Sequence, residues 1–249
     1  MTNIILHGCN GKMGKVLQSI LAADPDTTVV AGIDSKVDPD SDFPQFSTPG
    51  DCNVPGDVVI DFSHHTAVTD LIDWCLSTKT PAVICTTALG EDTLDMIQRA
   101  SAQVAMFRSA NMSLGINLLA KMMAEIVPVL EDAFFMEIIE KHHALKADSP
   151  SGTALLLADA INQACKTKKE FLYGRHSKQD QCKLQELGIH AVRGGTIPGE
   201  HTILFAGNDE LIELKHTALS KNIFANGAVK AARFLHGKPA GLYSMMDLL

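Results

Sequence analysis

The sequence predicts an α/β protein in two parts: a parallel sheet covered by helices, and an α+β part with a mostly antiparallel or mixed sheet. Over the first half of the chain, short apolar runs alternate with stretches that have helical apolar spacing. Later, strand-like runs follow one another directly across a tight turn. The first pattern is typical of parallel strands joined by helices, and the second of antiparallel strands.

The first half supplies the elements of the parallel sheet. The predicted strands are 3–7, 28–34, 58–61, 82–85 and 104–108, and the predicted helices are 12–23, 66–77 and 91–103. Residues 35–55 are polar and rich in Pro and Asp, which indicates a loop.

The second half has a different order of elements. We expect helices at 115–130 and 153–166 and strands at 134–141 and 188–193. Strands at 201–206 and 210–216 flank Gly207-Asn208-Asp209, which predicts a hairpin. A last helix is expected at 222–235.

Composition excludes several classes of protein. The chain has 249 residues, 46% of them hydrophobic and 20% charged, which fits a globular protein. A net charge of −8 argues against nucleic-acid binding, and no apolar run is long enough to predict a membrane span. No secretory signal is visible, and the six cysteines include no Cys-x-x-Cys pair. We therefore expect a reduced, cytoplasmic protein without a zinc site or disulfide scaffold.

A glycine-rich loop lies between the first predicted strand and helix. Gly8, Gly11 and Gly14 allow a sharp turn and close approach of a pyrophosphate, and the helix N-terminus that follows favours phosphate groups. Asp34 closes the second strand, where an acidic side chain accepts hydrogen bonds from the adenosine ribose. The spacing is Gly-x-x-Gly-x-x-Gly rather than the commoner Gly-x-Gly-x-x-Gly, so a purely structural βαβ turn is the alternative. The pattern predicts a Rossmann-like dinucleotide-binding domain.

The choice between NADH and NADPH stays open. Asp34 repels a 2′-phosphate and favours NADH, whereas Lys12 and Lys36 could each pair with that phosphate. The alternative is that both lysines are simply solvated. Use of both cofactors is the working hypothesis.

The second group of candidate residues lies between 140 and 153. His142, His143 and Lys146 fall within five residues, just before Ser151-Gly152-Thr153, which resembles a helix N-terminus able to hold a carboxylate. Histidine is the natural acid–base group near neutral pH, and Lys146 could bind an anion or give up a proton. A zinc site is disfavoured because His142 and His143 are adjacent, and the side chains of adjacent strand residues point in opposite directions. Ordinary loop polarity could explain any one of these residues, but not all of them together.

The sequence resembles the dihydrodipicolinate reductase (4-hydroxy-tetrahydrodipicolinate reductase) family over essentially its whole length. The segments that carry the resemblance are Gly8–Gly14, Asp61–Ser63, Ser109–Gly115, His142–Thr153, Gly199–Thr202 and Phe224–Ala228. The histidine, lysine and Ser-Gly-Thr stretch is highly specific, whereas the glycine loop alone is not.

The resemblance implies reduction of a cyclic dicarboxylate by NADPH or NADH, in lysine and diaminopimelate synthesis, by a homotetramer. It implies His142 and Lys146 as proton donors and His143, Ser151, Gly152 and Thr153 as substrate ligands. It also implies a discontinuous dinucleotide-binding domain, 1–112 with 222–249, around a substrate-binding and oligomerisation domain, 113–221. The residues expected at the cofactor are Gly8, Cys9, Asn10, Gly11, Lys12, Met13, Asp34, Lys36, Cys85, Thr86, Thr87, Ser109, Ala110, Asn111 and Met112.

One segment departs from the family. Where the family usually has Gly-Thr-Thr-Gly, this chain has Cys85-Thr86-Thr87-Ala88, which puts close approach of the nicotinamide in doubt. His64 and His65 are expected to be ordinary surface residues. The rival interpretations are a semialdehyde or homoserine dehydrogenase, the former needing a nucleophilic cysteine such as Cys85, and a non-catalytic dinucleotide sensor, which would have no use for His142 and Lys146.

Overall fold

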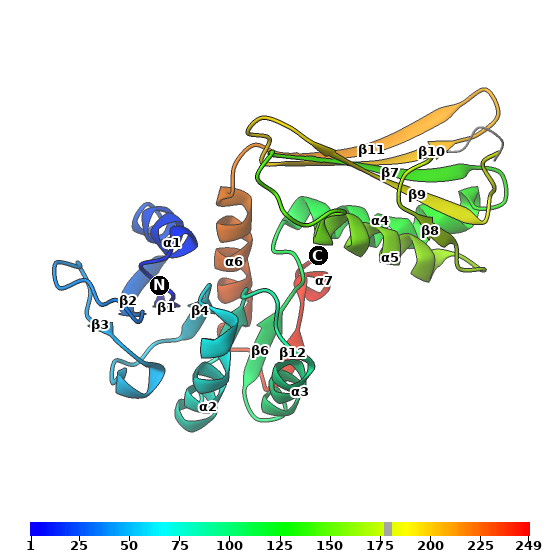
Figure 1. The fold of residues 1–249 in the computed structure, drawn as a ribbon. Coiled ribbons are helices and arrows are strands. Elements are labelled where there is room, and N and C mark those ends of the chain that lie inside the picture. The colour runs from blue at the N-terminus through cyan, green and yellow to red at the C-terminus, as the bar shows by residue number, and fades with distance from the viewer. Residues whose placement is uncertain (177–180) are drawn as a thin grey trace. The chain divides into compact units, whose positions relative to one another are not determined.

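The protein forms two compact units, each with its own sheet (Figure 1). The computed structural model describes residues 1–176 and 181–249. The first unit comprises Met1–Ser113 with Asn222–Leu249, and the second comprises Leu114–Lys221. The predicted fold class is confirmed: one sheet is parallel and the other is mixed. Within the described residues, no helix has the length and apolarity that a membrane crossing requires.

The first unit is built on a seven-stranded sheet in the order β12-β6-β5-β4-β1-β2-β3. All neighbouring strands in it are parallel. The strands are β1 (Thr2–His7), β2 (Thr27–Ile33), β3 (Gln45–Phe46), β4 (Val58–Asp61), β5 (Ala82–Ile84), β6 (Ala105–Arg108) and β12 (Gly241–Tyr243). The helices are α1 (Lys12–Ala22), α2 (Val68–Thr78), α3 (Glu91–Ala100), α6 (Asn222–Leu235) and α7 (Met245–Leu248), with 3-10 turns at Pro49–Asp51 and His65–Ala67.

Alternation along the strands fills both faces of this sheet. On β6, Met106 belongs to the buried cluster that includes Leu71 of α2 and Ile97 of α3. The next residue, Phe107, points the other way and packs edge-to-face on Phe234 of α6, with ring centroids 6.3 Å apart. The last long helix therefore belongs to the core of the first unit, although it follows the whole second unit in sequence.

Two glycines let α1 approach the end of β1. Gly8 has φ +79°, a left-handed conformation that side chains disfavour, and a Cβ there would lie 2.7 Å from the carbonyl oxygen of Phe62. A Cβ on Gly14 would lie 2.2 Å from the carbonyl oxygen of Cys9. The first turn of α1 is therefore packed directly against the glycine loop.

Two edge elements were not predicted. The segment 35–55, expected as a loop, contains the two-residue strand β3 and the 3-10 turn at Pro49–Asp51. Past α6 the chain forms β12, a three-residue strand that pairs with β6 and ends the sheet. Such short strands carry no apolar period of their own, because their pairing with a neighbour defines them.

The second unit has a five-stranded sheet in the order β11-β10-β7-β9-β8. Strands β7, β10 and β11 pair antiparallel, as the predicted hairpin requires, whereas β9 is parallel to both β7 and β8. The elements are α4 (Leu114–Leu130), β7 (Phe135–His142), α5 (Gly152–Ala164), β8 (Glu170–Leu172), β9 (Glu186–Arg193), β10 (Gly199–Ala206) and β11 (Leu211–Ala218). Helices α4 and α5 pack on each other and share one buried cluster with the sheet.

The end of β7 differs from the prediction. The sequence suggested a strand ending at Lys141 and a loop from His142 onward, but β7 extends through His142. Side chains on alternate strand residues share a face, so His142 lies on the same face as Glu140. The strand β8, of three residues, was missed.

Replacing Gly14 by alanine should destabilise the first unit. The added methyl group meets two backbone carbonyl oxygens within 2.3 Å, so the loop or α1 must shift, at a cost of about 1–3 kcal/mol. Urea unfolding measures this loss. Gly50→Ala is the matched control, since its Cβ has no neighbour nearer than 3.8 Å. Equal stability of the two variants would contradict the tight packing described here.

Candidate active site

The N-terminus of α1 is open to an anion. Gly11 caps the helix without a side-chain hydrogen bond, and no acidic residue lies in the first turn. The unpaired N–H groups of a first turn, together with the helix dipole, favour a phosphate at this end. Lys12, the first helical residue, is exposed.

Asp34 is tied to the glycine loop. Its two carboxylate oxygens accept hydrogen bonds from the backbone N–H groups of Asn10 and Lys36, each 3.0 Å long. The Asn10 side-chain amide donates to the Lys36 carbonyl oxygen at 2.6 Å and to Gln45 Oε1 at 2.8 Å. Asn10 therefore holds the loop against the end of β2, and the carboxylate has a fixed position beside it.

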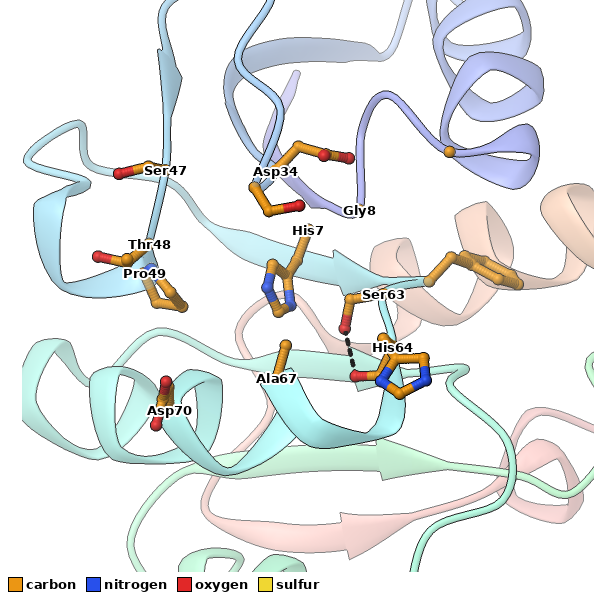
Figure 2. A pocket seen from close by; sticks show the side chains of 13 residues that line it. His7, Gly8, Asp34, Ser47, Thr48, Pro49, Ser63, His64, Ala67 and Asp70 are labelled. Carbon is orange, nitrogen blue, oxygen red and sulfur yellow. Dashed lines mark hydrogen bonds between the residues drawn. The ribbon is translucent and has the colours of Figure 1, made fainter.

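A cavity of about 290 Å³ lies against this loop (Figure 2). The residues that line it are His7, Gly8, Gly11, Asp34, Ser35, Ser47, Thr48, Pro49, Phe62, Ser63, His64, Ala67 and Asp70. A hollow bounded by a glycine loop, an open helix N-terminus and a carboxylate at the end of β2 fits the adenosine and pyrophosphate of a dinucleotide.

His7 and His64 are pocket residues that the sequence analysis missed. His7 is buried, and its Nδ1 lies 2.9 Å from Asp61 Oδ1. A histidine directly after the apolar run Ile4–Leu6 was the available signal. His64 is exposed as expected, but it also lines the cavity.

The segment 85–88 follows β5. Burial, with a smaller contribution from Asp61, holds the pKa of the Cys85 thiol well above its usual value, so the thiol stays protonated and is a poor nucleophile. This argues against a semialdehyde dehydrogenase. Ala88 has φ +58°, a left-handed conformation that glycine adopts more readily than alanine. The backbone at this position is therefore one that a glycine would suit.

The other residues expected at the nicotinamide lie in the same unit. Thr86 is buried and donates through Oγ1 to the Ser63 carbonyl oxygen at 3.1 Å. Asn111 and Met112 are buried just past the end of β6, and Asn111 Oδ1 accepts the Ser113 N–H at 2.8 Å. These contacts place both segments after the carboxyl ends of neighbouring strands, where ligands of open parallel sheets bind.

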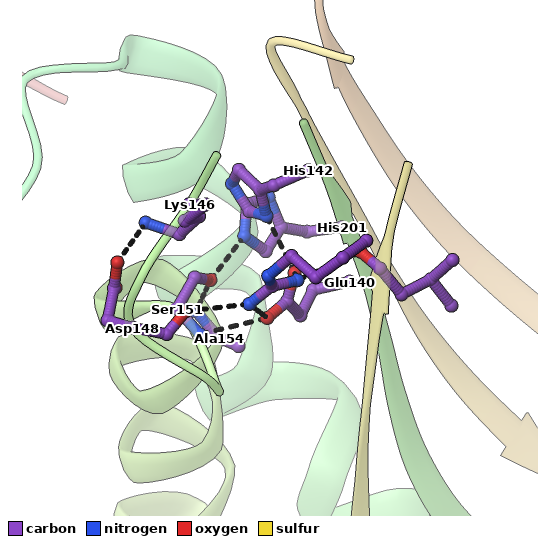
Figure 3. Close-up of polar contacts among 9 residues, drawn as sticks. Glu140, His142, Lys146, Asp148, Ser151, Ala154 and His201 are labelled. Carbon is purple, nitrogen blue, oxygen red and sulfur yellow. Dashed lines mark hydrogen bonds and ion pairs between the residues drawn. The ribbon is translucent and has the colours of Figure 1, made fainter. Parts of the chain in front are cut away.

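The second unit places His142 in a buried polar network (Figure 3). Its Nδ1 lies 2.6 Å from Oε2 of Glu140, a carboxylate with no solvent exposure. Arg193 donates to both oxygens of this carboxylate at 2.7 Å, and the Ser151 N–H donates to Oε1 at 3.0 Å. Burial raises the pKa of Glu140, but these hydrogen bonds outweigh it and the net pKa is lowered. Glu140 is therefore ionised and accepts the Nδ1–H of His142.

Ser151 joins α5 to this network. It is the N-cap residue, and its hydroxyl accepts the Ala154 N–H at 3.1 Å and lies 2.9 Å from Nε2 of His201. The rings of His201 and His142 meet edge-to-face with centroids 5.1 Å apart. Burial first, and the neighbouring His142 second, lower the pKa of His201 to about 4, so this imidazole is neutral near pH 7.

Lys146 lies in the loop between β7 and α5. Its Nζ is 2.8 Å from Asp148 Oδ1, and this bond lowers the pKa of the Asp148 carboxyl. His143 is half-exposed beside the buried His142, and Gly152 is exposed as the first residue of α5, followed by Thr153. His142, Lys146 and the Ser-Gly-Thr segment are thus brought together in one unit, at the N-terminus of a helix with no acidic residue in its first turn.

Glu140, Arg193 and His201 are the members of this network that the sequence analysis did not identify. Glu140 is two residues before His142, so strand alternation was a usable signal for it. Arg193 and His201 come from β9 and β10, and only strand pairing brings them to β7. No three His, Cys, Asp or Glu side chains gather as metal ligands in the part of the chain that the structure describes.

A parallel sheet with a glycine loop, joined to a mixed sheet that carries a buried acid–base group, is the architecture of two-domain oxidoreductases that bind a dinucleotide. Two family models match this chain: dihydrodipicolinate reductase N-terminus over residues 2–112, and dihydrodipicolinate reductase C-terminus over residues 115–249. The chain belongs to the dihydrodipicolinate reductase family. It is an oxidoreductase of a family that uses NADH or NADPH.

Curated relatives agree along the full length. A 4-hydroxy-tetrahydrodipicolinate reductase of Caldanaerobacter subterraneus subsp. tengcongensis is 51% identical, covering 100% of this chain and 98% of its own. One from Clostridium tetani is 46% identical, with coverage of 100% and 97%.

Solved structures support the fold. A dipicolinate-bound dihydrodipicolinate reductase from Paenisporosarcina sp. TG-14 is 22% identical, with a TM-score of 0.84 and 100% coverage of both chains. An aspartate dehydrogenase from Thermotoga maritima has a TM-score of 0.55 at 11% identity, covering 96% of this chain and 98% of its own. The fold is therefore shared with other dehydrogenases and does not by itself define the reaction.

The depressed pKa of His201 should make stability depend on pH. Between pH 6.5 and about 4 the unfolded chain binds a proton at this residue and the folded chain does not, so the free energy of unfolding falls as the pH falls. The loss should reach roughly 2–4 kcal/mol at the low end.

Urea unfolding at a series of pH values measures this loss. His201→Gln should flatten the dependence over this window, although it also removes the contact with Ser151. His236→Gln, at an exposed position, is the control and should leave the slope unchanged. An unaltered slope in His201→Gln would show that another group causes the acid sensitivity.

Proposed function

We propose that the chain reduces 4-hydroxy-tetrahydrodipicolinate to tetrahydrodipicolinate, with loss of water, in lysine and diaminopimelate synthesis. The observation that carries the proposal is His142, buried against the ionised Glu140. The loop that follows it carries Lys146 and leads to Gly152 and Thr153 at the N-terminus of α5. In this proposal a proton donor lies beside a site for carboxylate groups. The family membership supplies the substrate class.

The first unit is proposed as the dinucleotide-binding domain. The phosphates would lie at the N-terminus of α1, along the loop Gly8-Cys9-Asn10-Gly11-Lys12-Met13, and the adenosine ribose at Asp34 beside Lys36. The nicotinamide would contact the residues Cys85, Thr86, Thr87, Ser109, Ala110, Asn111 and Met112. When bound, the cofactor supplies the hydride.

The second unit is proposed to bind the cyclic dicarboxylate and to supply protons. Gly152 and Thr153 would hold one carboxylate at the first turn of α5, where the dipole and the backbone N–H groups favour an anion. His143 and Lys146 would add polar and positive partners. These fixed donors would stabilise the negative charge of the substrate carboxylates and the charge that develops on the substrate during the reaction.

Protons are proposed to come from His142 and Lys146. Hydride addition to the ring requires one proton. Departure of the 4-hydroxyl group as water takes a proton from an acid while the neighbouring ring carbon gives one up as the double bond forms, so one proton is consumed overall. His142 is buried and hydrogen-bonded to a carboxylate, which orients it for one of these transfers. Lys146, held by Asp148, can release its proton to the substrate when the ring binds beside it.

The oligomeric state and the cellular location of the protein are proposed from the family alone. The resemblance implies a homotetramer, assembled through the second unit, that works in the cytoplasm. Neither point affects the assignments within one chain.

Removing the proton donors should abolish turnover without unfolding the protein. His142→Ala and Lys146→Ala should each lower kcat by about 10²–10⁴-fold, the usual contribution of general acid–base catalysis. The assay follows NADH and NADPH oxidation with the hydroxy-tetrahydrodipicolinate substrate generated in situ. Lys121→Ala is the matched lysine control, because Lys121 is an exposed residue of α4. If the double variant His142→Ala/Lys146→Ala retained activity, the mechanism would be wrong.

Both nicotinamide cofactors should support the reaction. Asp34 disfavours the 2′-phosphate and Lys36 favours it, so kcat/KM with NADH and NADPH should agree within about a hundredfold, or 2.7 kcal/mol. Lys36→Ala should reduce kcat/KM for NADPH about tenfold and leave NADH unchanged, since only NADPH carries the paired phosphate. Lys15→Ala is the control, on α1 and exposed. An equal loss with both cofactors would remove Lys36 from the phosphate site.

A further inference from the structure

Glu140 has no solvent exposure, yet it carries a charge that four donors share. Arg193 binds both of its oxygens, the Ser151 N–H binds Oε1, and His142 Nδ1 binds Oε2. A buried carboxylate is tolerated only when its charge is paired and its lone pairs are used. The planar guanidinium fork of Arg193 meets both requirements at once.

An ionised carboxylate can only accept hydrogen bonds. The 2.6 Å contact with His142 is therefore a donation from Nδ1–H, whether the imidazole is neutral or charged. It follows that Nε2 is the nitrogen that gains and loses the proton. This atom faces Gly199, where an added Cβ would lie only 3.1 Å away, so the missing side chain leaves space beside the nitrogen.

The other polar groups near His142 have partners of their own, so Glu140 is the acceptor for its Nδ1–H. His201 from β10 is neutral and bonded to Ser151 of α5. In the loop after β7, Lys146 is paired with Asp148, whose backbone carbonyl also accepts from Arg193 Nη2 at 2.8 Å. Figure 3 shows Glu140, Lys146, Ser151 and His201 around the imidazole. Glu140 accepts hydrogen bonds from both His142 and Arg193.

We propose that Glu140 and Arg193 are positioning residues for proton transfer. Glu140 fixes His142 as the Nδ1–H tautomer and directs Nε2 to the substrate, while Arg193 acts through Glu140 by holding its carboxylate in the charged form and in place. This inference rests on the proposed role of His142. It deepens that role by naming the atom that carries the proton and the residues that select it.

The competing interpretation is structural: the ion pair would merely tie β7 to β9 and to the start of α5. The second unit contains a similar cluster with which the Glu140 network can be compared. Glu137, on the same strand, lies 2.6 Å from Nε2 of His190 and 2.7 Å from Nη2 of Arg175, so it forms a similar carboxylate, histidine and arginine cluster away from His142. Glu137→Gln and Arg175→Lys are therefore matched controls.

The tautomer of His142 is measured first, by ¹⁵N NMR of the histidine-labelled full chain over a range of pH, with His142→Gln used to assign the signal. The neutral wild-type ring should be in the Nδ1–H form. In Glu140→Gln the neutral ring should lose this single tautomer. Glu137→Gln should leave it unchanged. A wild-type ring in the Nε2–H form, or an unchanged tautomer in Glu140→Gln, would overturn the inference.

Kinetics form the second measurement. Glu140→Gln should lower kcat about 10–100-fold with KM little changed, the size expected for a partner that orients a functional imidazole. Arg193→Met should resemble Glu140→Gln, and Arg193→Lys, which keeps the charge, should recover part of kcat. Full activity in Arg193→Met, or an equal loss in Arg175→Lys, would contradict a positioning role.

The two measurements separate this inference from the proposed function. The wild-type tautomer needs no turnover and no variant other than His142→Gln for assignment, so it tests the inference even if Glu140→Gln fails to fold. If the wild-type protein does not oxidise NADH or NADPH with the hydroxy-tetrahydrodipicolinate substrate, the proposed function fails while the tautomer result stands.

Discussion

The second unit depends on one buried charge. The Glu140 carboxylate ties β7 to β9 through Arg193 and to the start of α5 through the Ser151 N–H, at the point where the chain leaves the sheet for a helix. Removing one partner of such a pair leaves an uncompensated buried charge, which is far more costly than never having formed the pair. The same carboxylate holds His142, so the interaction that fixes the local fold also sets the geometry of the candidate acid.

The first unit depends on a steric constraint rather than a charge. Without side chains at Gly8 and Gly14, α1 packs onto the end of β1 and presents its N-terminus at the loop. Asn10 and Asp34 then connect this loop to the end of β2. Each unit therefore has a helix N-terminus that favours an anion, and we propose the first for a dinucleotide and the second for a dicarboxylate. Helix termini suit both tasks because backbone donors there need no side-chain charge.

Cys85 and Ala88 stand where the sequence comparison with the family expects glycine. Ala88 keeps a left-handed backbone, which costs an alanine roughly 1–2 kcal/mol that glycine would not lose. Cys85 is buried and protonated, so it acts as a small apolar side chain. Close approach of a nicotinamide at this segment therefore depends on the Cys85 side chain rather than on the path of the backbone.

The sequence by itself determined the fold class, most helices and strands, and the segments that carry the family resemblance, because apolar period and glycine spacing are local properties. It could not indicate β3, β8 or β12, which are too short to have a period and exist only through pairing. It identified His142 and Lys146 as candidates, and these assignments stay predictions. Only the tertiary structure decided what surrounds His142, because Arg193 and His201 reach it from other strands. Arg193 and His201 lie far from His142 in the sequence, so no local pattern connects them with it. Sheet register brings them into hydrogen-bonding or van der Waals contact with the network.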